Sequence, residues 1–197
     1  MSDCRSHPLF RLLCDDAVAL RALEPADAVV TVAWRNDPEI RDQILSFRFP
    51  VSHVMETNFI DRAISGDGIQ QCVAGIVDLS DGALCGLAYL RDIDWISRNA
   101  AFGMMIGRRD RQRRGLGRRA LRLMLQHGFD VLNLERVFLY VVEYNLVARR
   151  LYETSGFSYE GSLRKHVALG GKRYDLLAMG MLREEFDRLA ISKKDSA

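Results

Sequence analysis

The stretch that decides the fold is residues 100–142, AAFGMMIGRRDRQRRGLGRRALRLMLQHGFDVLNLERVFLYVV. Its pattern predicts a buried strand at 100–107, a basic loop, a helix that begins at Leu116, and a β-rich apolar strand at 136–142. Two strands that are joined through a full helix can pair in parallel, which a short turn does not allow. We therefore expect 100–107 and 136–142 to be the one parallel pair of a mixed sheet.

The flanking sequence predicts antiparallel strands and further helices. The turn-forming pairs Asp81-Gly82 and Gly170-Gly171 each lie within a predicted hairpin. The expected strands are 18–23, the hairpins 70–94 and 156–182, and the pair already named; the expected helices are 24–37, 52–66, 116–132 and 146–155. In the helix 52–66 the expected N-cap is Ser52, and the apolar residues on one side are Val54, Met55, Phe59, Ile60 and Ile64.

These elements predict one α+β (α/β) domain with a mixed, mostly antiparallel sheet. The chain has 197 residues, about half of them apolar, which is enough for one well-buried core. We expect an N-terminal extension at 1–15, the domain at 16–190 and a C-terminal tail at 191–197. An additional edge strand from the N-terminal run stays open, and the last residues, SKKDSA, are expected to be a loose end.

Positive charge is concentrated in the loop and helix of residues 108–122. Eight arginines and one aspartate give this run a local charge of +7, and the rest of the chain carries about −5. Such a focal patch suits a compact polyanion better than a long nucleic acid. A solvated arginine face on an amphipathic helix is the alternative, and charge alone leaves it open.

The cysteines and histidines are scattered, without the spacing of a zinc site or of a disulfide framework. We therefore expect four reduced thiols, no metal and a cytoplasmic protein. No apolar run approaches the ~20 residues of a membrane span, and the first residues lack a signal-peptide pattern. No membrane is expected among the partners.

The segment QRRGLG, residues 112–117, lies between the end of a strand and the start of a helix. Glycines allow backbone N–H groups to point into one concavity, and the first helical turn adds a partial positive charge. A pyrophosphate fits such a site, and arginine forks match further phosphate oxygens. The Walker pattern needs a lysine that is absent here, and the dinucleotide pattern fails because Ala120 stands in place of its third glycine.

A second group of residues follows the strand 136–142. Asn145, Ala148 and Tyr152 share one face of the predicted helix, because a separation of seven residues is nearly two turns. Ala148 leaves room for a ligand along that face, Asn145 offers an amide, and Tyr152 offers a phenolic proton. The structural alternatives, an N-cap role for Asn145 and a half-buried helix aromatic at Tyr152, both stay open.

Together these residues resemble the GNAT family of acyl-CoA-dependent N-acetyltransferases, in its branch of ribosomal-protein N-terminal, spermidine and amino-sugar enzymes. The segment 112–117 matches the family's Q/R-x-x-G-x-G/A signature. Asn145, Ala148 and Tyr152, followed by Gly156-Phe157, match its N-x-x-A-x-x-x-Y…G-F block. The resemblance implies a central sheet of about seven strands with a splayed parallel pair and helices on both faces.

The resemblance further implies acetyl-CoA as co-substrate and Tyr152 as the acid that protonates the departing CoA thiolate. The implied cofactor-binding residues are Met104, Met105, Ile106, Gln112, Arg113, Arg114, Gly115, Leu116, Gly117, Arg118, Asn145, Ala148 and Arg149. Backbone N–H groups of 112–118 hold the pyrophosphate in this scheme, and the strand 104–106 pairs with the pantetheine amides. A backbone N–H near Met105 polarises the thioester carbonyl, and the amine attacks it directly without a metal.

The sequence does not identify the general base. Some relatives carry a glutamate just before the phenylalanine of the strand 100–107, and this chain has Ala101 at that position. The remaining candidates are Asp92, Asp94, Glu143, His53 and His166.

The acceptor is expected to be a small-molecule or peptide amine. An amino sugar, a polyamine and a protein N-terminus stay open, as does assembly into a homodimer. We expect no nucleic acid among the partners. Two alternative functions nevertheless remain, a nucleic-acid-binding module built on the arginine helix and a non-catalytic acyl-CoA-binding relative.

Overall fold

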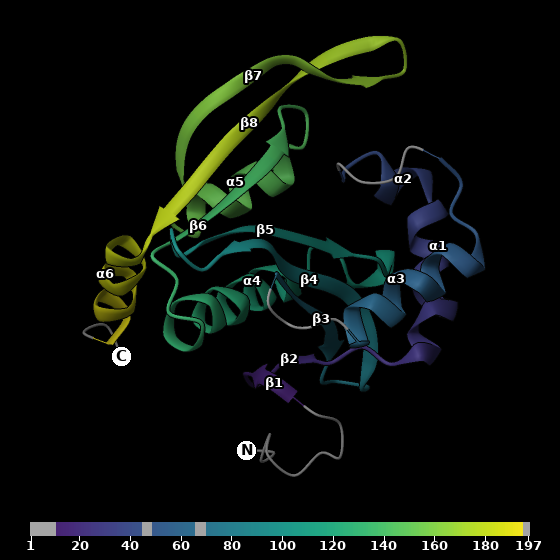
Figure 1. The fold of residues 1–197 in the computed structure, drawn as a ribbon, viewed down its shortest axis with the longest axis horizontal. Coiled ribbons are helices and arrows are strands. Elements are labelled where there is room, and N and C mark those ends of the chain that lie inside the picture. The colour runs from purple at the N-terminus through teal and green to yellow at the C-terminus, as the bar shows by residue number, and fades with distance from the viewer. Residues whose placement is uncertain (1–10, 45–48, 66–69, 195–197) are drawn as a thin grey trace.

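The computed structural model describes residues 11–44, 49–65 and 70–194. Within them, one eight-stranded sheet has the order β1-β2-β3-β4-β5-β6-β8-β7 (Figure 1). Its strands are β1 (Arg11–Cys14), β2 (Val18–Arg21), β3 (Gln71–Asp78), β4 (Ala83–Asp94), β5 (Asn99–Ile106), β6 (Arg136–Val142), β7 (Ser158–Leu169) and β8 (Lys172–Leu182). The eighth strand, beyond the seven expected, is β1, the edge strand that the sequence left open. Each neighbouring pair is antiparallel except β5 and β6, which confirms the predicted parallel pair.

The predicted helices occur in the predicted order, and α2, η3 and the C-terminal α6 are additions to them. They are η2 (Pro25–Asp27), α1 (Ala28–Asn36), α2 (Pro38–Arg41), α3 (His53–Ser65), η3 (Arg109–Arg111), α4 (Leu116–Gln126), η4 (His127–Val131), α5 (Leu146–Thr154) and α6 (Arg183–Lys194). The sequence analysis missed α6, which extends into the stretch that was expected to be a loose end. This helix is held to the body by Phe186, whose ring stacks on Phe129 at 4.8 Å between centroids.

The parallel pair opens soon after it begins. Asn99, Ala100 and Ala101 of β5 lie opposite residues 136–138 of β6. Beyond these three positions, the described register pairs β5 with β4 and β6 with β8. The sheet is therefore split between residues 102–106 and residues 139–142, and the splayed pair implied by the resemblance is confirmed.

Helices cover both faces of the sheet (Figure 1). On one face α4 buries Leu121 and Met124, and η4 buries Phe129, against strand side chains. On the other face α1 and α3 pack over Leu87 and Met105 with Trp34 and Ile60. Because side chains alternate along a strand, β5 directs Met104 and Ile106 toward α4 and Met105 toward α1. The split in the sheet thus connects two differently covered faces.

The buried side of α3 differs from the expected apolar stripe. Three members of that stripe are exposed, namely Val54, Met55 and Ile64. The interior position is taken by Glu56, which is fully buried and whose Oε2 lies 2.5 Å from Nε of the buried Arg35. A carboxylate can be buried when a cation neutralises it, and the apolar pattern of the sequence does not show this pairing. The expected N-cap is confirmed, since the Met55 N–H donates to Ser52 Oγ at 3.2 Å.

The cysteines depart from the expectation of four reduced thiols. Cys72 and Cys85 are free, and burial raises the pKa of each to about 11. Cys14 is disulfide-bonded, although no spacing motif in the sequence marks it for a bridge. Among the described residues, no helix combines the length and the apolar character that crossing a membrane requires.

Candidate active site

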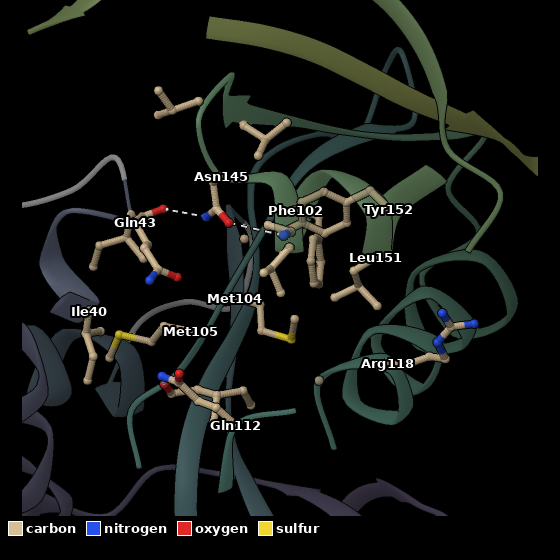
Figure 2. A pocket seen from close by; sticks show the side chains of 18 of the residues that line it. Ile40, Gln43, Phe102, Met104, Met105, Gln112, Arg118, Asn145, Leu151 and Tyr152 are labelled. Atoms are coloured by element: carbon tan, nitrogen blue, oxygen red, sulfur yellow. Dashed lines mark hydrogen bonds between the residues drawn. The ribbon is translucent and has the colours of Figure 1, made fainter. Parts of the chain in front are cut away.

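A cavity of about 420 Å³ lies at the split in the sheet. Its walls come from β4 and β5 on one side, from β6 and α5 on the other, and from the loop that leads into α4. Figure 2 shows β5 running through the middle, with Met104 on the same side as Leu151 and Tyr152 and Met105 on the side of Ile40. The cavity therefore passes beside β5 from one face of the sheet to the other.

The loop before α4 turns its backbone N–H groups outward. Arg113 and Gly115 have positive φ angles of 58° and 82°, and at Gly115 the absence of a side chain makes this conformation inexpensive. Within α4 the Arg118 N–H donates to Gly115 O at 3.1 Å. From residue 113 to 117, the N–H groups have no acceptor among the described residues. Unpaired donors at a helix N-terminus are an arrangement that can bind an anion.

Arg111 and Gln112 anchor the loop to the β3–β4 turn and to β5. Arg111 lies 2.5 Å from Asp78 Oδ2 and 2.5 Å from Asp81 Oδ2, at the two ends of the β3–β4 turn. Although burial opposes it, hydrogen bonds from Ser80 and Arg111 lower the pKa of Asp78 to about 2, so this carboxylate stays charged. Gln112 Nε2 donates to Ile106 O at 3.1 Å. The loop is thus held against the end of β5.

Acids within the run and from other elements pair with most of the arginines in residues 108–122. Five of the eight arginines have a carboxylate within 4.0 Å, namely Arg108, Arg109, Arg111, Arg114 and Arg119. Arg113, Arg118 and Arg122 have none among the described residues, and only the first two of these line the cavity. The basic patch is therefore smaller than the sequence indicates, and the positive charge without a carboxylate partner is concentrated at the N-terminus of α4.

Gly117 lies in the first turn of α4 and faces Met104. A Cβ atom at this position would be 3.4 Å from Met104 Cε, which is an ordinary contact. The glycine is thus not required by close packing within the chain. Its small size instead keeps the helix N-terminus open toward the cavity.

The backbone of β5 faces the split at alternate residues. Gly107 N–H donates to Cys85 O of β4 at 2.9 Å. Because main-chain groups of successive strand residues point to opposite neighbours, those of Ile106 and Met104 point toward the split. The main chain of Met105 points toward β4, so the N–H group that the sequence analysis placed near Met105 is better supplied by Met104.

On α5, Asn145 has a structural role. Its Oδ1 accepts the Ala148 N–H at 3.1 Å, and its Nδ2 donates to Gln43 O at 3.1 Å, as Figure 2 shows. The N-cap role, one of the two that the sequence left open, is therefore present. The second bond ties the chain after α2 to the start of α5 across the cavity, as does the bond from Tyr144 Oη to Asp42 O.

Tyr152 lies one turn beyond Ala148 and is 7% exposed. Its ring packs edge-on against Phe102 and Phe157, with centroids 6.2 and 5.8 Å away. Burial, and then the nearby Tyr89, raise the pKa of Tyr152 well above its usual value. The hydroxyl has no hydrogen-bond partner among the described residues, although the side chain lines the cavity. It is therefore a protonated phenol that can donate to a ligand.

Most residues expected at the site line the cavity, namely Met104, Met105, Ile106, Gln112, Arg113, Gly115, Gly117, Arg118, Asn145, Ala148 and Tyr152. Three do not. The Leu116 side chain is buried in the core under α4, Arg114 lies 3.7 Å from Asp78, and Arg149 lies 2.8 Å from Glu153.

None of the expected base candidates lines the cavity. Asp94 Oδ1 accepts the N–H groups of Ile96 and Ser97, and Glu143 Oε1 accepts the Asp175 N–H. More generally, the described lining residues include no aspartate, glutamate or histidine. The ionisable groups of the lining are arginines and tyrosines. Likewise, no group of three or more possible metal ligands occurs in the described part of the chain.

The sequence analysis missed several lining residues, among them Gln43, Tyr89, Arg91 and Tyr140. Tyr89 fits because it lies opposite Gly103, where a Cβ would be 2.1 Å from the tyrosine ring. A glycine within the predicted strand 100–107 was the available signal, since such a glycine marks close approach of another group. Its partner could not be identified without the register of β4 and β5.

Comparisons with known proteins agree with this architecture. A family model described as an acetyltransferase (GNAT) domain matches residues 17–158. The putative ribosomal N-acetyltransferase of Bacillus subtilis is 26% identical over 183 residues, which cover 91% of this chain and 98% of that protein. The spermidine N(1)-acetyltransferase of Vibrio cholerae is 32% identical over 111 residues, or 56% of this chain and 64% of that protein.

A solved structure extends the likeness to nearly the whole fold. The spermidine N-acetyltransferase of Vibrio cholerae, in complex with CoA and spermine, superposes with a TM-score of 0.80 at 26% identity. The match covers 87% of this chain and 99% of that one. The chain therefore belongs to the GNAT acetyltransferase family and is an acetyl-CoA-dependent N-acetyltransferase.

Proposed function

We propose that the protein transfers an acetyl group from acetyl-CoA to a primary amine by direct attack within a ternary complex. The observation that carries the proposal is the split between β5 and β6, which leaves main-chain groups of β5 facing a cavity with an anion-binding helix N-terminus at one end. The donor brings a thioester, which supplies an activated acetyl group. The chain's own residues bind it, orient it and manage the protons.

The residues present fit such a donor at three points. The N–H groups of residues 113–117 and the side chains of Arg113 and Arg118 suit the pyrophosphate. The main-chain groups of Met104 and the N–H group of Ile106 suit the amides of the pantetheine arm, as an added strand would pair. Ala148 and Leu151 form an apolar wall on α5. Asn145 contributes by capping α5 and by fixing the chain at Gln43, rather than by offering an unoccupied amide.

At the reacting end, Tyr152 and the N–H group of Met104 have different roles. The phenol of Tyr152 stays protonated near neutral pH, because burial raises its pKa. It can therefore give its proton to the departing thiolate. The Met104 N–H points into the split and stabilises negative charge that develops on the carbonyl oxygen.

Direct transfer is favoured over a covalent acetyl-enzyme. A nucleophilic cysteine needs an accessible thiolate, whereas burial raises the pKa of Cys72 and Cys85 to about 11. Neither thiol is among the residues that line the cavity. The alternative of a nucleic-acid-binding module is weakened because most arginines of the run face carboxylates.

Steady-state kinetics with both substrates varied test this proposal, with CoA release followed through its free thiol and the acetylated amine confirmed by mass spectrometry. We expect intersecting lines, as a ternary complex requires. Tyr152→Phe should lower kcat on the order of 10²-fold with little change in acetyl-CoA affinity. Parallel lines with a labelled acetyl-enzyme would contradict direct transfer, and wild-type turnover by the variant would exclude Tyr152 as the acid. Acetyl-CoA binding without any transfer would instead favour a non-catalytic role.

A further inference from the structure

We propose that the acceptor is an amine that also carries a carboxylate or phosphate group, and that Arg91 binds that group. This inference rests on the proposed acetyl transfer and names the substrate class for the same cavity. It is carried by the charges of the lining residues on the face of the sheet opposite α4.

The acceptor side of the cavity is defined by alternation along the strands. In β4, Ala88 and Leu90 pack into the core under α4, so Tyr89 and Arg91 point to the opposite face. In β6, Leu139 and Val141 belong to the same core, so Tyr140 also points to the opposite face. Tyr89, Arg91 and Tyr140 all line the cavity. A molecule that enters from this face meets two phenols and one guanidinium.

Arg91 lies beside the point where the sheet splits. It is opposite Ala101, the last residue of β5 that pairs with β6. Its guanidinium lies 5.6 Å from the Tyr89 ring centroid, and its side chain is 46% exposed. Among the described residues its only ion-pair partner is Asp92, at 3.8 Å from Nε and 78% exposed. Such an exposed pair is weak, and the guanidinium keeps most of its donors for a ligand.

A polyamine does not suit this side of the cavity. A polycation needs carboxylates to replace its hydration, yet no aspartate or glutamate is found among the described lining residues. Arg91 would also repel a second ammonium group close to the split. The carboxylate of Glu160 on β7 is already paired with Arg136 of β6, so it is not free to bind a polycation. The spermidine acetyltransferases thus share the fold with this chain but need not share the acceptor.

A carboxylate or a phosphate matches the site better. The guanidinium fork binds either group through two parallel hydrogen bonds, whereas a neutral amine gains nothing from it. The rings of Tyr89 and Tyr140 would cover the apolar part of the acceptor. With its anionic group held at Arg91, the amine is directed toward the split, where the acetyl group is delivered.

The test uses two pairs of amines that differ in charge but, within each pair, have similar amine pKa values. Glucosamine is paired with glucosamine 6-phosphate, alanyl-alaninamide with alanyl-alanine, and spermidine represents the polycations. We expect the anionic member of at least one pair to have the higher kcat/KM by about 10- to 100-fold, as is typical of a hydrogen bond to a charged group. The pair that shows the effect distinguishes a phosphate from a carboxylate.

Variants of Arg91 connect the preference to the residue. Arg91→Gln should reduce the ratio of anionic to neutral kcat/KM to near one, and Arg91→Lys should restore part of it. Arg188→Gln, at an exposed position on α6, should keep the wild-type ratio. The inference is overturned if spermidine is the better substrate, if neither pair shows a preference, or if Arg91→Gln leaves the ratio unchanged.

Failure of acetyl transfer itself can be told apart from failure of this inference. If no amine in the panel is acetylated, the same anionic amines are titrated by calorimetry into the complex of the protein with CoA. Binding that is weakened about 10-fold or more by Arg91→Gln supports the anionic subsite without turnover. Absence of such binding overturns it.

Discussion

The absence of a carboxylate or imidazole from the described lining predicts how the rate depends on pH and on the acceptor. An amine attacks only in its neutral form, and a base in the cavity would normally remove its proton. Here the lining offers phenols and guanidiniums, and burial keeps Tyr152 protonated by raising its pKa. The neutral fraction of the free amine should therefore set kcat/KM.

The magnitude follows from the pKa values of the two common kinds of amine. At pH 7, roughly a tenth to a fifth of an α-amine with a pKa of about 7.7–8.0 is neutral, against about 0.04% of an alkyl amine with a pKa near 10.4. The two should thus differ in kcat/KM by several hundred-fold before any contribution from binding. For each amine, kcat/KM should rise about ten-fold per pH unit and level off near the pKa of that amine.

The assay measures kcat/KM between pH 6 and 9 for amines of matched size and different pKa, with CoA release as the readout. The pH at which kcat/KM levels off should move with the pKa of the amine. An inflection at one fixed pH for all amines would reveal a titrating base in the enzyme, and a plateau below the amine pKa would do the same. Either result would refute the reasoning from the lining residues.

Two further predictions concern binding and stability. Arg118→Ala should weaken acetyl-CoA binding about 10-fold or more, whereas Arg122→Ala, on the same helix but outside the cavity, should not; equal effects in calorimetry would argue against a specific phosphate contact. Glu56→Gln removes the charge that the buried Arg35 guanidinium faces at 2.5 Å, so unfolding in urea should show a loss of about 3–5 kcal/mol. A loss below about 1 kcal/mol would mean that the pair is not needed to hold α3, and the double variant with Arg35→Met should recover part of the stability.

Much of the fold follows from local pattern. The split strands, the hairpin turns and the amphipathic helix at 116–126 are specified by apolar runs and glycines, and the structure confirms them. Where the local pattern gave a wrong or missing prediction, the structure is set by interactions between segments that are distant in sequence. The buried side of α3 depends on Glu56 meeting Arg35 from α1, and α6 is held by the stacking of Phe186 on Phe129. Such pairings have no signature in the local sequence.

The candidate site was likewise predicted where it depends on local sequence and missed where it depends on distant segments. The loop at 112–117 and the residues of α5 were found because their spacing along one chain segment has a direct chemical meaning. Tyr89, Arg91 and Tyr140 were missed because only the strand register brings them to the split. The charge of residues 108–122 was overestimated for a related reason, since Asp15, Asp37 and Asp78, which neutralise it, lie far away in sequence.

Calorimetric titration of acetyl-CoA into the Gly117→Asp and Gly117→Asn variants tests most directly whether the N-terminus of α4 holds the phosphates. A Cβ atom at this position makes only ordinary contacts within the chain, and a carboxylate in the first helical turn favours the helix. Both variants should therefore fold, with thermal unfolding as the control. We predict one-to-one binding by the wild type, weaker binding by the asparagine variant and no measurable binding by the aspartate variant. Wild-type affinity in the aspartate variant would contradict the account.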